Sequence, residues 1–147
     1  MGRITRIAGA AGGLLVLTLA AGPILAASGQ ALFMERCSAC HQADGSGTVG
    51  MAPSLRSGAL KKLDKQAPTY VVGVILNGMS GVKLDGASYA GAMPPWSDLS
   101  DADVSALGSF VLRKLNGTRT GVTARAAAEV RKQQLGLPEL KALRGAP

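Results

Sequence analysis

The chain contains few of the side chains that most often bind metal ions in proteins. Its 147 residues include one histidine and two cysteines. A structural zinc site needs four ligands, usually cysteine and histidine, so this chain would have to recruit carboxylates for one. Because the chain has only one histidine, two of its histidines cannot bind the same metal ion.

The three residues that are present form a single motif. Cys37 and Cys40 are three positions apart and His41 follows directly, which is the haem-attachment spacing C-x-x-C-H. On a helical turn both thiols point the same way and can form thioether bonds to the two vinyl groups of one haem. A neutral imidazole can then bind the iron. We predict one covalently bound haem c; the alternatives are a chance match or a thioredoxin-like redox pair, which lacks its βαβ pattern here.

Large aromatic side chains are also scarce. Phe33 and Phe110 are the only phenylalanines, and Trp96 is the only tryptophan. The 120 residues that follow position 27 suffice for one small domain with a modest apolar core. A buried haem would enlarge this core greatly. We therefore expect the cofactor to form part of the core.

The formal net charge of +7 is not spread over the chain. Residues 28–117 contain eight basic and seven acidic side chains, whereas residues 118–147 contain six basic and two acidic ones. The basic character therefore belongs to a C-terminal extension, residues 118–147, which we expect to be partly helical. We interpret its charge as a solvated helix face and expect no nucleic-acid partner.

Residues 1–27 have the features of a secretory signal peptide. Arg3 and Arg6 supply a basic start, an apolar stretch follows from Ile7, and small residues precede Ser28. An uncleaved membrane anchor is the alternative, because the apolar stretch is nearly long enough to span a bilayer. In both cases we expect residues 28–147 to lie in the periplasm, with membrane contact only if the leader is retained.

Local sequence signals predict several helices, joined by loops, over residues 28–117, which we expect to form one domain. A short helix from Ser28 leads into the haem motif, and Pro68 starts a helix of about ten residues that ends at Asn77. The intervening residues 42–58 form a glycine-rich loop. Although residues 45–50 match the dinucleotide pattern G-x-G-x-x-G, no strand precedes them and no helix follows, so we reject that reading.

The last helix of the domain carries the clearest local signals. Ser100 is the expected N-cap, Asp103 would complete a capping box, and Leu99 can pack against Val104 as a hydrophobic staple. Asn116 and the glycine after it end this helix.

The C-terminal extension contains one more predicted helix. Thr123 would cap a helix over residues 124–135, and Gly136 and Pro138 would stop it. Its face is poor in large apolar side chains, so we expect loose packing against the domain or a role in binding a partner.

The candidates for the sixth iron ligand are methionines, because thioether sulfur is a suitable axial ligand for haem iron; an open or otherwise ligated iron is the alternative. Met34 lies on the attachment helix and Met51 lies too close to the motif in sequence. Met93 is preferred over Met79 because two prolines restrict the backbone directly after it.

These motifs resemble the class I cytochromes c, specifically the bacterial monohaem type, over residues 28–116. The resemblance implies an all-α fold with helices wrapped around one covalently bound haem. It also implies that Gly29 and Phe33 let the first helix cross closely against the helix that bears Leu107 and Phe110. The residues that carry the resemblance are Gly29 and Phe33, the C-x-x-C-H motif, residues 52–55, residues 92–96, Leu107 and Phe110.

The resemblance implies further roles for single residues. The carbonyl of Pro53 would accept a hydrogen bond from His41 and orient it. Leu55 would line the haem face and Met93 would be the distal ligand. Trp96 would either reach a haem propionate or pack at the rim of the pocket.

With both axial positions filled, no site remains for a substrate, and we expect an electron-transfer protein rather than an enzyme. It would carry single electrons in a respiratory chain, between a dehydrogenase or quinol-oxidising complex and a terminal acceptor. The alternatives are a cytochrome subunit of a larger dehydrogenase or oxidase, and a haem enzyme in which Met93 is displaceable.

Overall fold

The computed structural model describes residues 27–56, 58–84 and 86–145, so the predicted leader lies outside the described residues except for Ala27. The described chain is mostly helical, as predicted, and none of its helices is long and apolar enough to cross a membrane. Its elements are α1 (Gly29–Arg36), α2 (Ser38–His41), α3 (Ala59–Lys62), the 3₁₀-helix η1 (Asp64–Gln66), α4 (Ala67–Asn77), β1 (Val82–Leu84), β2 (Ala87–Tyr89), α5 (Asp101–Ser109), the π-helix η2 (Phe110–Leu115), α6 (Ala124–Gln133) and α7 (Leu137–Leu143).

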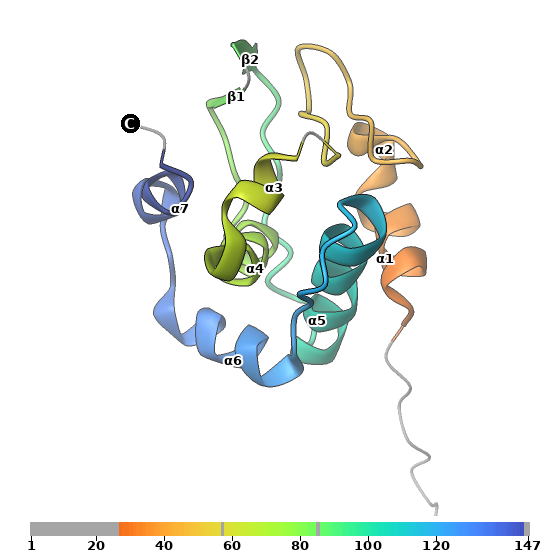
Figure 1. The fold of residues 1–147 in the computed structure, drawn as a ribbon, viewed down its shortest axis with the longest axis vertical. Coiled ribbons are helices and arrows are strands. Elements are labelled where there is room, and N and C mark those ends of the chain that lie inside the picture. The colour runs from red at the N-terminus through yellow and green to blue at the C-terminus, as the bar shows by residue number, and fades with distance from the viewer. Residues whose placement is uncertain (1–26, 57, 85, 146–147) are drawn as a thin grey trace, which may run out of the picture.

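Helix α1 crosses α5 at very close range (Figure 1). A Cβ atom on Gly29 would collide with the main-chain carbonyl of Ala106 and lie 2.9 Å from the Cβ atom of Phe110. The rings of Phe33 and Phe110 pack beside this contact, with centroids 5.2 Å apart and planes inclined by 41°. The close crossing expected from Gly29 and Phe33 is therefore confirmed.

Helix α5 begins where the sequence predicted, but its cap differs from the expected one. The Ser100 hydroxyl oxygen accepts a hydrogen bond from the Asp103 N–H at 3.1 Å. The Asp103 carboxylate does not reach back to the Ser100 N–H; it accepts bonds from the Ser100 hydroxyl at 2.7 Å and from the Ala27 N–H at 3.2 Å. The aspartate side chain is one methylene shorter than the Glu or Gln that usually closes a capping box, which explains the difference.

Helix α5 continues through η2 to the predicted end at Asn116, whose side chain is buried. The Asn116 amide nitrogen donates to the carbonyl of Val111 at 2.8 Å and to the carbonyl of Leu55 at 2.7 Å. This residue therefore ties the end of the last core helix to the loop that follows the C-x-x-C-H motif.

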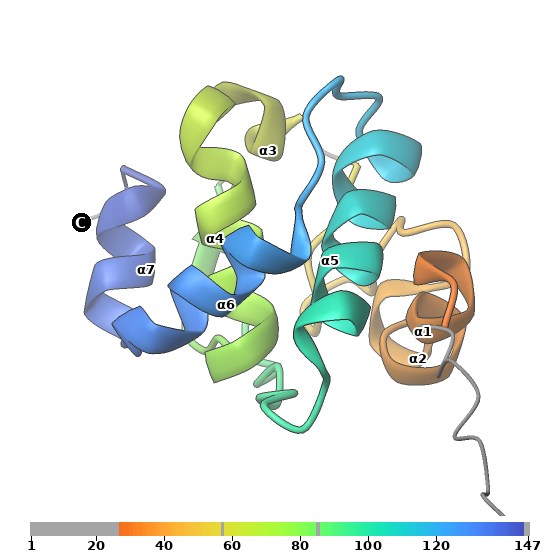
Figure 2. The ribbon, with the colours of Figure 1, turned by 90° about the horizontal axis from the view of Figure 1, so that it is seen from below.

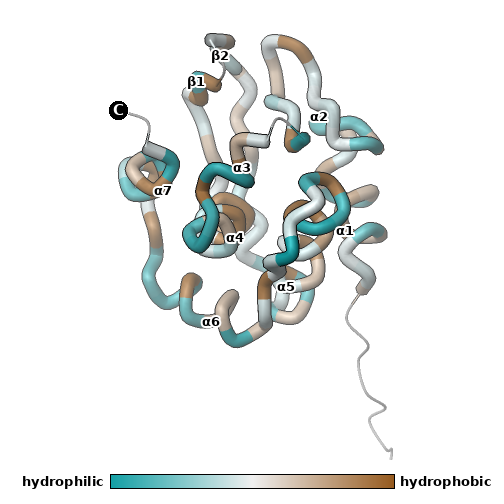
Figure 3. The backbone as a smooth tube through the Cα atoms, in the orientation of Figure 1, coloured by the Kyte–Doolittle hydropathy of each residue, from teal (hydrophilic) through white to brown (hydrophobic). Residues whose placement is uncertain are grey.

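Helix α4 lies at the centre of the molecule and contacts α5, α6 and α7. Pro68 lies in its first turn and Asn77 is its last residue, so the predicted helix is confirmed. Hydrophobic segments of α4 and α5 lie near the middle of the fold in Figure 3. The buried side chains of α4 are Ala67, Tyr70, Val71, Val72, Ile75 and Leu76.

The C-terminal extension packs more closely than the sequence indicated. Helix α6 runs across α4 and α5, and α7 lies beside α4 (Figure 2). The helix predicted over residues 124–135 is present as α6, which ends at Gln133. Pro138 lies in the first turn of the next helix, α7, because proline has the φ angle of a helix and lacks an N–H that would need a partner. Leu140 is completely buried, and a Cβ atom on Gly73 of α4 would lie 2.5 Å from its Cδ2 atom. The expectation of loose packing was wrong.

The segment between α4 and α5 contains an antiparallel hairpin that the sequence analysis did not predict. Its strands β1 and β2 pair with Val82 opposite Tyr89. The strands are three residues long, too short for an alternating pattern to be distinguished from a loop. They form one side of the cavity described below.

Candidate haem site

An apolar cavity of about 370 Å³ is lined by helices and by two loops, the one after the C-x-x-C-H motif and the one between α4 and α5. This volume falls within the range of small-molecule and cofactor sites in proteins. The cavity is lined by residues of α1, α2, α4, the hairpin, α5 and both loops, and most of these residues are hydrophobic. Cys37, Cys40, His41, Pro53, Leu55, Met93 and Trp96, the residues predicted for the site, all line it.

A single helical turn brings the two cysteines to the cavity. The Cys37 carbonyl accepts hydrogen bonds from the N–H groups of Cys40 at 3.2 Å and His41 at 2.9 Å. Burial, with a smaller effect of Cys40, raises the pKa of the Cys37 thiol to about 11. Redox-active C-x-x-C pairs instead have a cysteine of lowered pKa. The environment of Cys37 therefore disfavours the redox-pair alternative.

His41 is buried, and its Nδ1 atom lies 3.0 Å from the carbonyl oxygen of Pro53. Burial lowers the pKa of His41, and the hydrogen bond to Pro53 opposes this to a smaller extent. The imidazole is therefore neutral at pH 7. Because a carbonyl only accepts hydrogen bonds, Nδ1 carries the proton and Nε2 keeps its lone pair available for a metal.

The loop after the motif has to fold tightly to bring Pro53 to His41. Gly47 has a φ angle of +81°, and a Cβ atom there would lie 2.6 Å from the carbonyl carbon of Pro53. Its N–H donates to the carbonyl of His41 at 2.9 Å. The Leu55 N–H donates to the Gly45 carbonyl at 2.9 Å, which holds Leu55 at the cavity wall.

Two methionines face the cavity together. Met79 and Met93 form an isolated antiparallel bridge, in which residues directly opposite each other project to the same face. Both side chains line the cavity, with Met79 buried and Met93 half-buried. Gly78, with φ +75°, permits the close approach, since a Cβ atom on it would lie 2.5 Å from the Met93 carbonyl oxygen. The fold thus presents both candidate ligands to one space.

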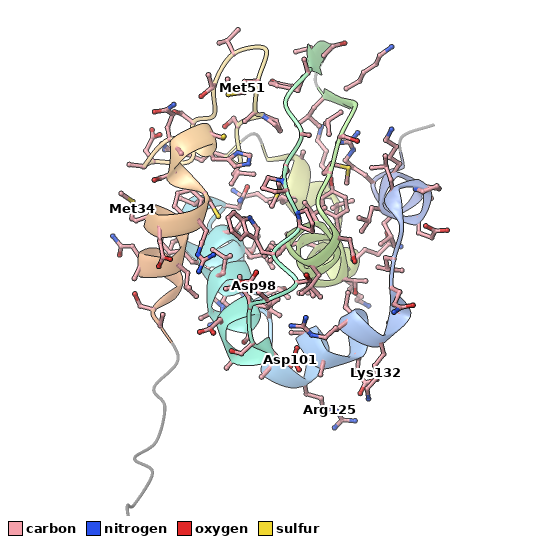
Figure 4. All side chains as sticks on the ribbon, turned by 180° about the vertical axis from the view of Figure 1, so that it is seen from behind. Met34, Met51, Asp98, Asp101, Arg125 and Lys132 are labelled. Atoms are coloured by element: carbon pink, nitrogen blue, oxygen red, sulfur yellow. The ribbon has the colours of Figure 1, made fainter. Side chains whose placement is uncertain are left out.

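The two methionines that the sequence analysis set aside are both exposed (Figure 4). Met34 is 46% exposed on α1 and does not line the cavity. Met51 is 49% exposed, yet part of it reaches the cavity wall from the loop after the motif.

Trp96 lies at the cavity wall and is half-buried. The guanidinium carbon of Arg36 lies 5.1 Å from the centroid of its ring, a cation–π distance. This contact fits packing at the rim, and contact between Trp96 and a propionate stays a prediction.

Several polar residues of the cavity wall were not predicted from the sequence, among them Tyr70 and Arg144. Tyr70 lies among the buried apolar residues of α4, so the sequence pattern did not distinguish it from a core residue. Arg144 lies beyond the point where the sequence analysis ended the last helix, so nothing in the local pattern placed it near the haem motif.

A model of the cytochrome c family matches residues 26–114. The chain belongs to the cytochrome c family. Its fold is therefore that of a class I cytochrome c, and membership implies a covalent haem c, attached at the C-x-x-C-H motif, and electron transfer. The cavity fits this group, because its walls are apolar and two thiols and one neutral imidazole face into it.

Two curated relatives agree with this assignment. Cytochrome c-552 of Nitrosomonas europaea is 39% identical over 79 residues, which cover 53% of this chain and 69% of that cytochrome. The gluconate 2-dehydrogenase cytochrome c subunit of Pantoea cypripedii is 29% identical over 111 residues, 73% of this chain. The chain spans only about a quarter of that subunit, with 24% covered. Helices α6 and α7 lie beyond the residues that the family model matches.

Proposed function

We propose that this cytochrome is a periplasmic one-electron carrier with a single haem c, whose iron is bound by His41 and Met93. One observation carries the proposal: both thiols of the C-x-x-C-H motif, the oriented neutral imidazole of His41 and the side chain of Met93 line the same apolar cavity. Pro53 and Leu55 complete the wall near His41.

When bound, a haem c supplies an iron that changes oxidation state by one electron. His41 presents Nε2 to the cavity because its Nδ1–H donates to Pro53, and Met93 presents a thioether from a segment restricted by two prolines. With His41 and Met93 both holding the iron, no position on it would remain for a substrate or oxygen. The walls of the same space are mostly apolar.

The relatives support redox proteins as partners. One of them is named as the cytochrome c subunit of a dehydrogenase, which favours a dehydrogenase as the electron donor. We propose delivery from such a dehydrogenase, or from a quinol-oxidising complex, to a terminal acceptor of a respiratory chain. The signal-peptide pattern of residues 1–27 supports the periplasm as the location.

A cytochrome subunit of a multi-subunit dehydrogenase is the second candidate, favoured by that same match. The two functions differ in whether the protein leaves its partner. A carrier purifies alone and exchanges electrons with a dehydrogenase at a rate that depends on its concentration. A subunit copurifies with a dehydrogenase in fixed ratio.

Absorption spectroscopy and carbon monoxide binding test the axial ligands. The secreted protein should show the thioether-to-iron band in the ferric state and should bind carbon monoxide slowly or not at all when reduced at pH 7. Mass spectrometry should show one haem bound to the chain. Rapid carbon monoxide binding by the protein without substitutions would favour the haem-enzyme alternative. Cysteine thiols that carry no haem would refute the proposal.

A further inference from the structure

The charged side chains that line the cavity in the described part of the chain are all positive. Among the described residues that line it, Arg36 and Arg144 carry positive charges and none is an aspartate or glutamate. A haem carries two propionate carboxylates, and a carboxylate that is partly removed from water is strongly disfavoured unless it is paired. The two arginines are therefore the candidate partners for these groups.

Arg36 already has carboxylate partners. Its Nε atom lies 2.9 Å from Glu35 Oε1, and its Nη1 atom lies 3.7 Å from Asp98 Oδ2. Its guanidinium also packs over the ring of Trp96. The charge of Arg36 is thus balanced without a ligand.

Arg144 follows the last residue of α7 and is placed differently. Its Nη2 atom donates to the Lys83 carbonyl of β1 at 3.1 Å, and the guanidinium lies near enough to Tyr70 to act on the pKa of the phenol. Within the described part of the chain, no carboxylate lies at ion-pair distance from it. Both of these partners are neutral, so the positive charge at this wall of the cavity is not balanced.

Tyr70 is the second polar group at this wall, and it is 8% exposed. Burial raises the pKa of Tyr70, and the nearby charge of Arg144 lowers it by a smaller amount, so the phenol is protonated at pH 7. The protonated phenol therefore carries an O–H that can be donated to an acceptor in the cavity.

We propose that Arg144 and Tyr70 form the binding site for one carboxylate of the cofactor, with the guanidinium and the phenol O–H both donating to a haem propionate. This inference rests on the proposed function, since it needs a haem in the cavity. It also gives the C-terminal extension a role: α7 is fixed on α4 by the contact between Leu140 and Gly73, and it delivers Arg144 to the cavity from outside the residues that the family model matches.

Three variants of the haem-loaded protein test this site. Arg144→Gln removes the charge, Arg144→Lys keeps the charge but removes the planar fork, and Tyr70→Phe removes only the hydroxyl. Arg125→Gln is the matched control, because Arg125 is exposed on α6 and points away from the fold (Figure 4). The readouts are the midpoint reduction potential and the propionate bending modes in the resonance Raman spectrum.

Loss of a positive charge beside the cofactor favours the oxidised iron, so Arg144→Gln should lower the reduction potential. We expect about a tenfold change in the one-electron reduction equilibrium, which corresponds to about 59 mV. Arg144→Lys should shift the potential less, Tyr70→Phe should shift mainly the propionate modes, and Arg125→Gln should leave both readouts unchanged.

The inference is overturned if Arg144→Gln matches Arg125→Gln in potential and also keeps the propionate modes of the unmodified protein. If Arg144→Gln does not retain haem, Tyr70→Phe decides: shifted propionate modes support the site, and unchanged modes overturn it. Failure of the proposed function is a separate result, because it would appear in the unmodified protein as missing haem or a missing thioether-to-iron band.

Discussion

Met79 and Met93 exchange two main-chain hydrogen bonds, from the Met79 N–H to the Met93 carbonyl at 3.1 Å and from the Met93 N–H to the Met79 carbonyl at 2.8 Å. This pairing joins the second residue after α4 to the residue just before two prolines. It places both side chains at the wall of one cavity. Either methionine could therefore reach an iron bound there.

Replacement of each methionine by alanine separates the two candidates. We predict that Met93→Ala abolishes the thioether-to-iron absorption band and allows carbon monoxide to bind the reduced protein rapidly. Met79→Ala should retain the band but lower the free energy of unfolding by about 2–5 kcal/mol, because Met79 is buried. Met34→Ala, at an exposed position outside the cavity, is the control and should change neither. Loss of the band in Met79→Ala alone would reverse the assignment.

Arg131 of α6 anchors the segment that follows Met93. Its guanidinium bonds the Asp101 carboxylate at 2.8 Å and the carbonyls of Ser97 at 2.9 Å and Leu99 at 2.6 Å. Both charged side chains are about one-third exposed, at 34% and 37%, so solvent screening reduces the effect. We predict that Arg131→Ala lowers the free energy of unfolding by about 1–3 kcal/mol.

Urea denaturation of the haem-loaded protein measures that change. Lys132→Ala is the neighbouring control, because its ion pair with Glu129 is exposed and should contribute about 0–1 kcal/mol. An Arg131→Ala protein as stable as Lys132→Ala would show that α6 does not anchor the segment.

Leu140 tests whether the C-terminal extension is part of the core. Its side chain is completely buried against α4, so Leu140→Ala should lower the free energy of unfolding by about 2–5 kcal/mol. Ala142→Ser, at an exposed position of α7, should change it by less than about 0.5 kcal/mol. Equal stability of the two variants in thermal or urea denaturation would mean that α7 is not packed as described.

Gly29 tests the crossing of α1 and α5. Alanine favours a helix more than glycine does, by roughly 1 kcal/mol, yet a Cβ atom here collides with the carbonyl of Ala106. Backbone cannot yield as a flexible side chain can, so we predict a net loss of about 1–3 kcal/mol in Gly29→Ala. Gln30→Ala, exposed on the same helix, should be neutral or slightly stabilising. A more stable Gly29→Ala protein would refute the close crossing.

Tyr70 should make stability depend on alkaline pH. The pKa of Tyr70 is raised in the folded state, mainly by burial, so its favourable contribution is present below the unfolded pKa of about 10 and is lost as the pH rises above it. Relative to Tyr70→Phe, the unmodified protein should lose up to about 1.4 kcal/mol of unfolding free energy per pH unit in that range. Urea denaturation of both proteins at pH 8 and above pH 10 measures the difference, and a constant difference would contradict the prediction.

Local sequence signals determined several features of this cytochrome. The spacing of Cys37, Cys40 and His41 indicated the haem motif, and Pro68 and Ser100 placed the starts of two helices, because caps and helix-start residues act within one turn of the chain. The hydrogen bond between His41 and Pro53 followed from the resemblance and is present in the structure.

Only the tertiary structure decided what long-range packing brings together. It paired Met79 with Met93, buried Leu140 of an apparently polar extension, and carried Arg144 to the cavity that contains His41. These contacts join segments far apart in the chain, and no local propensity encodes the distance between them. The sequence by itself specified which chemistry the chain carries, and the packing of α4, α6 and α7 decided which side chains surround it.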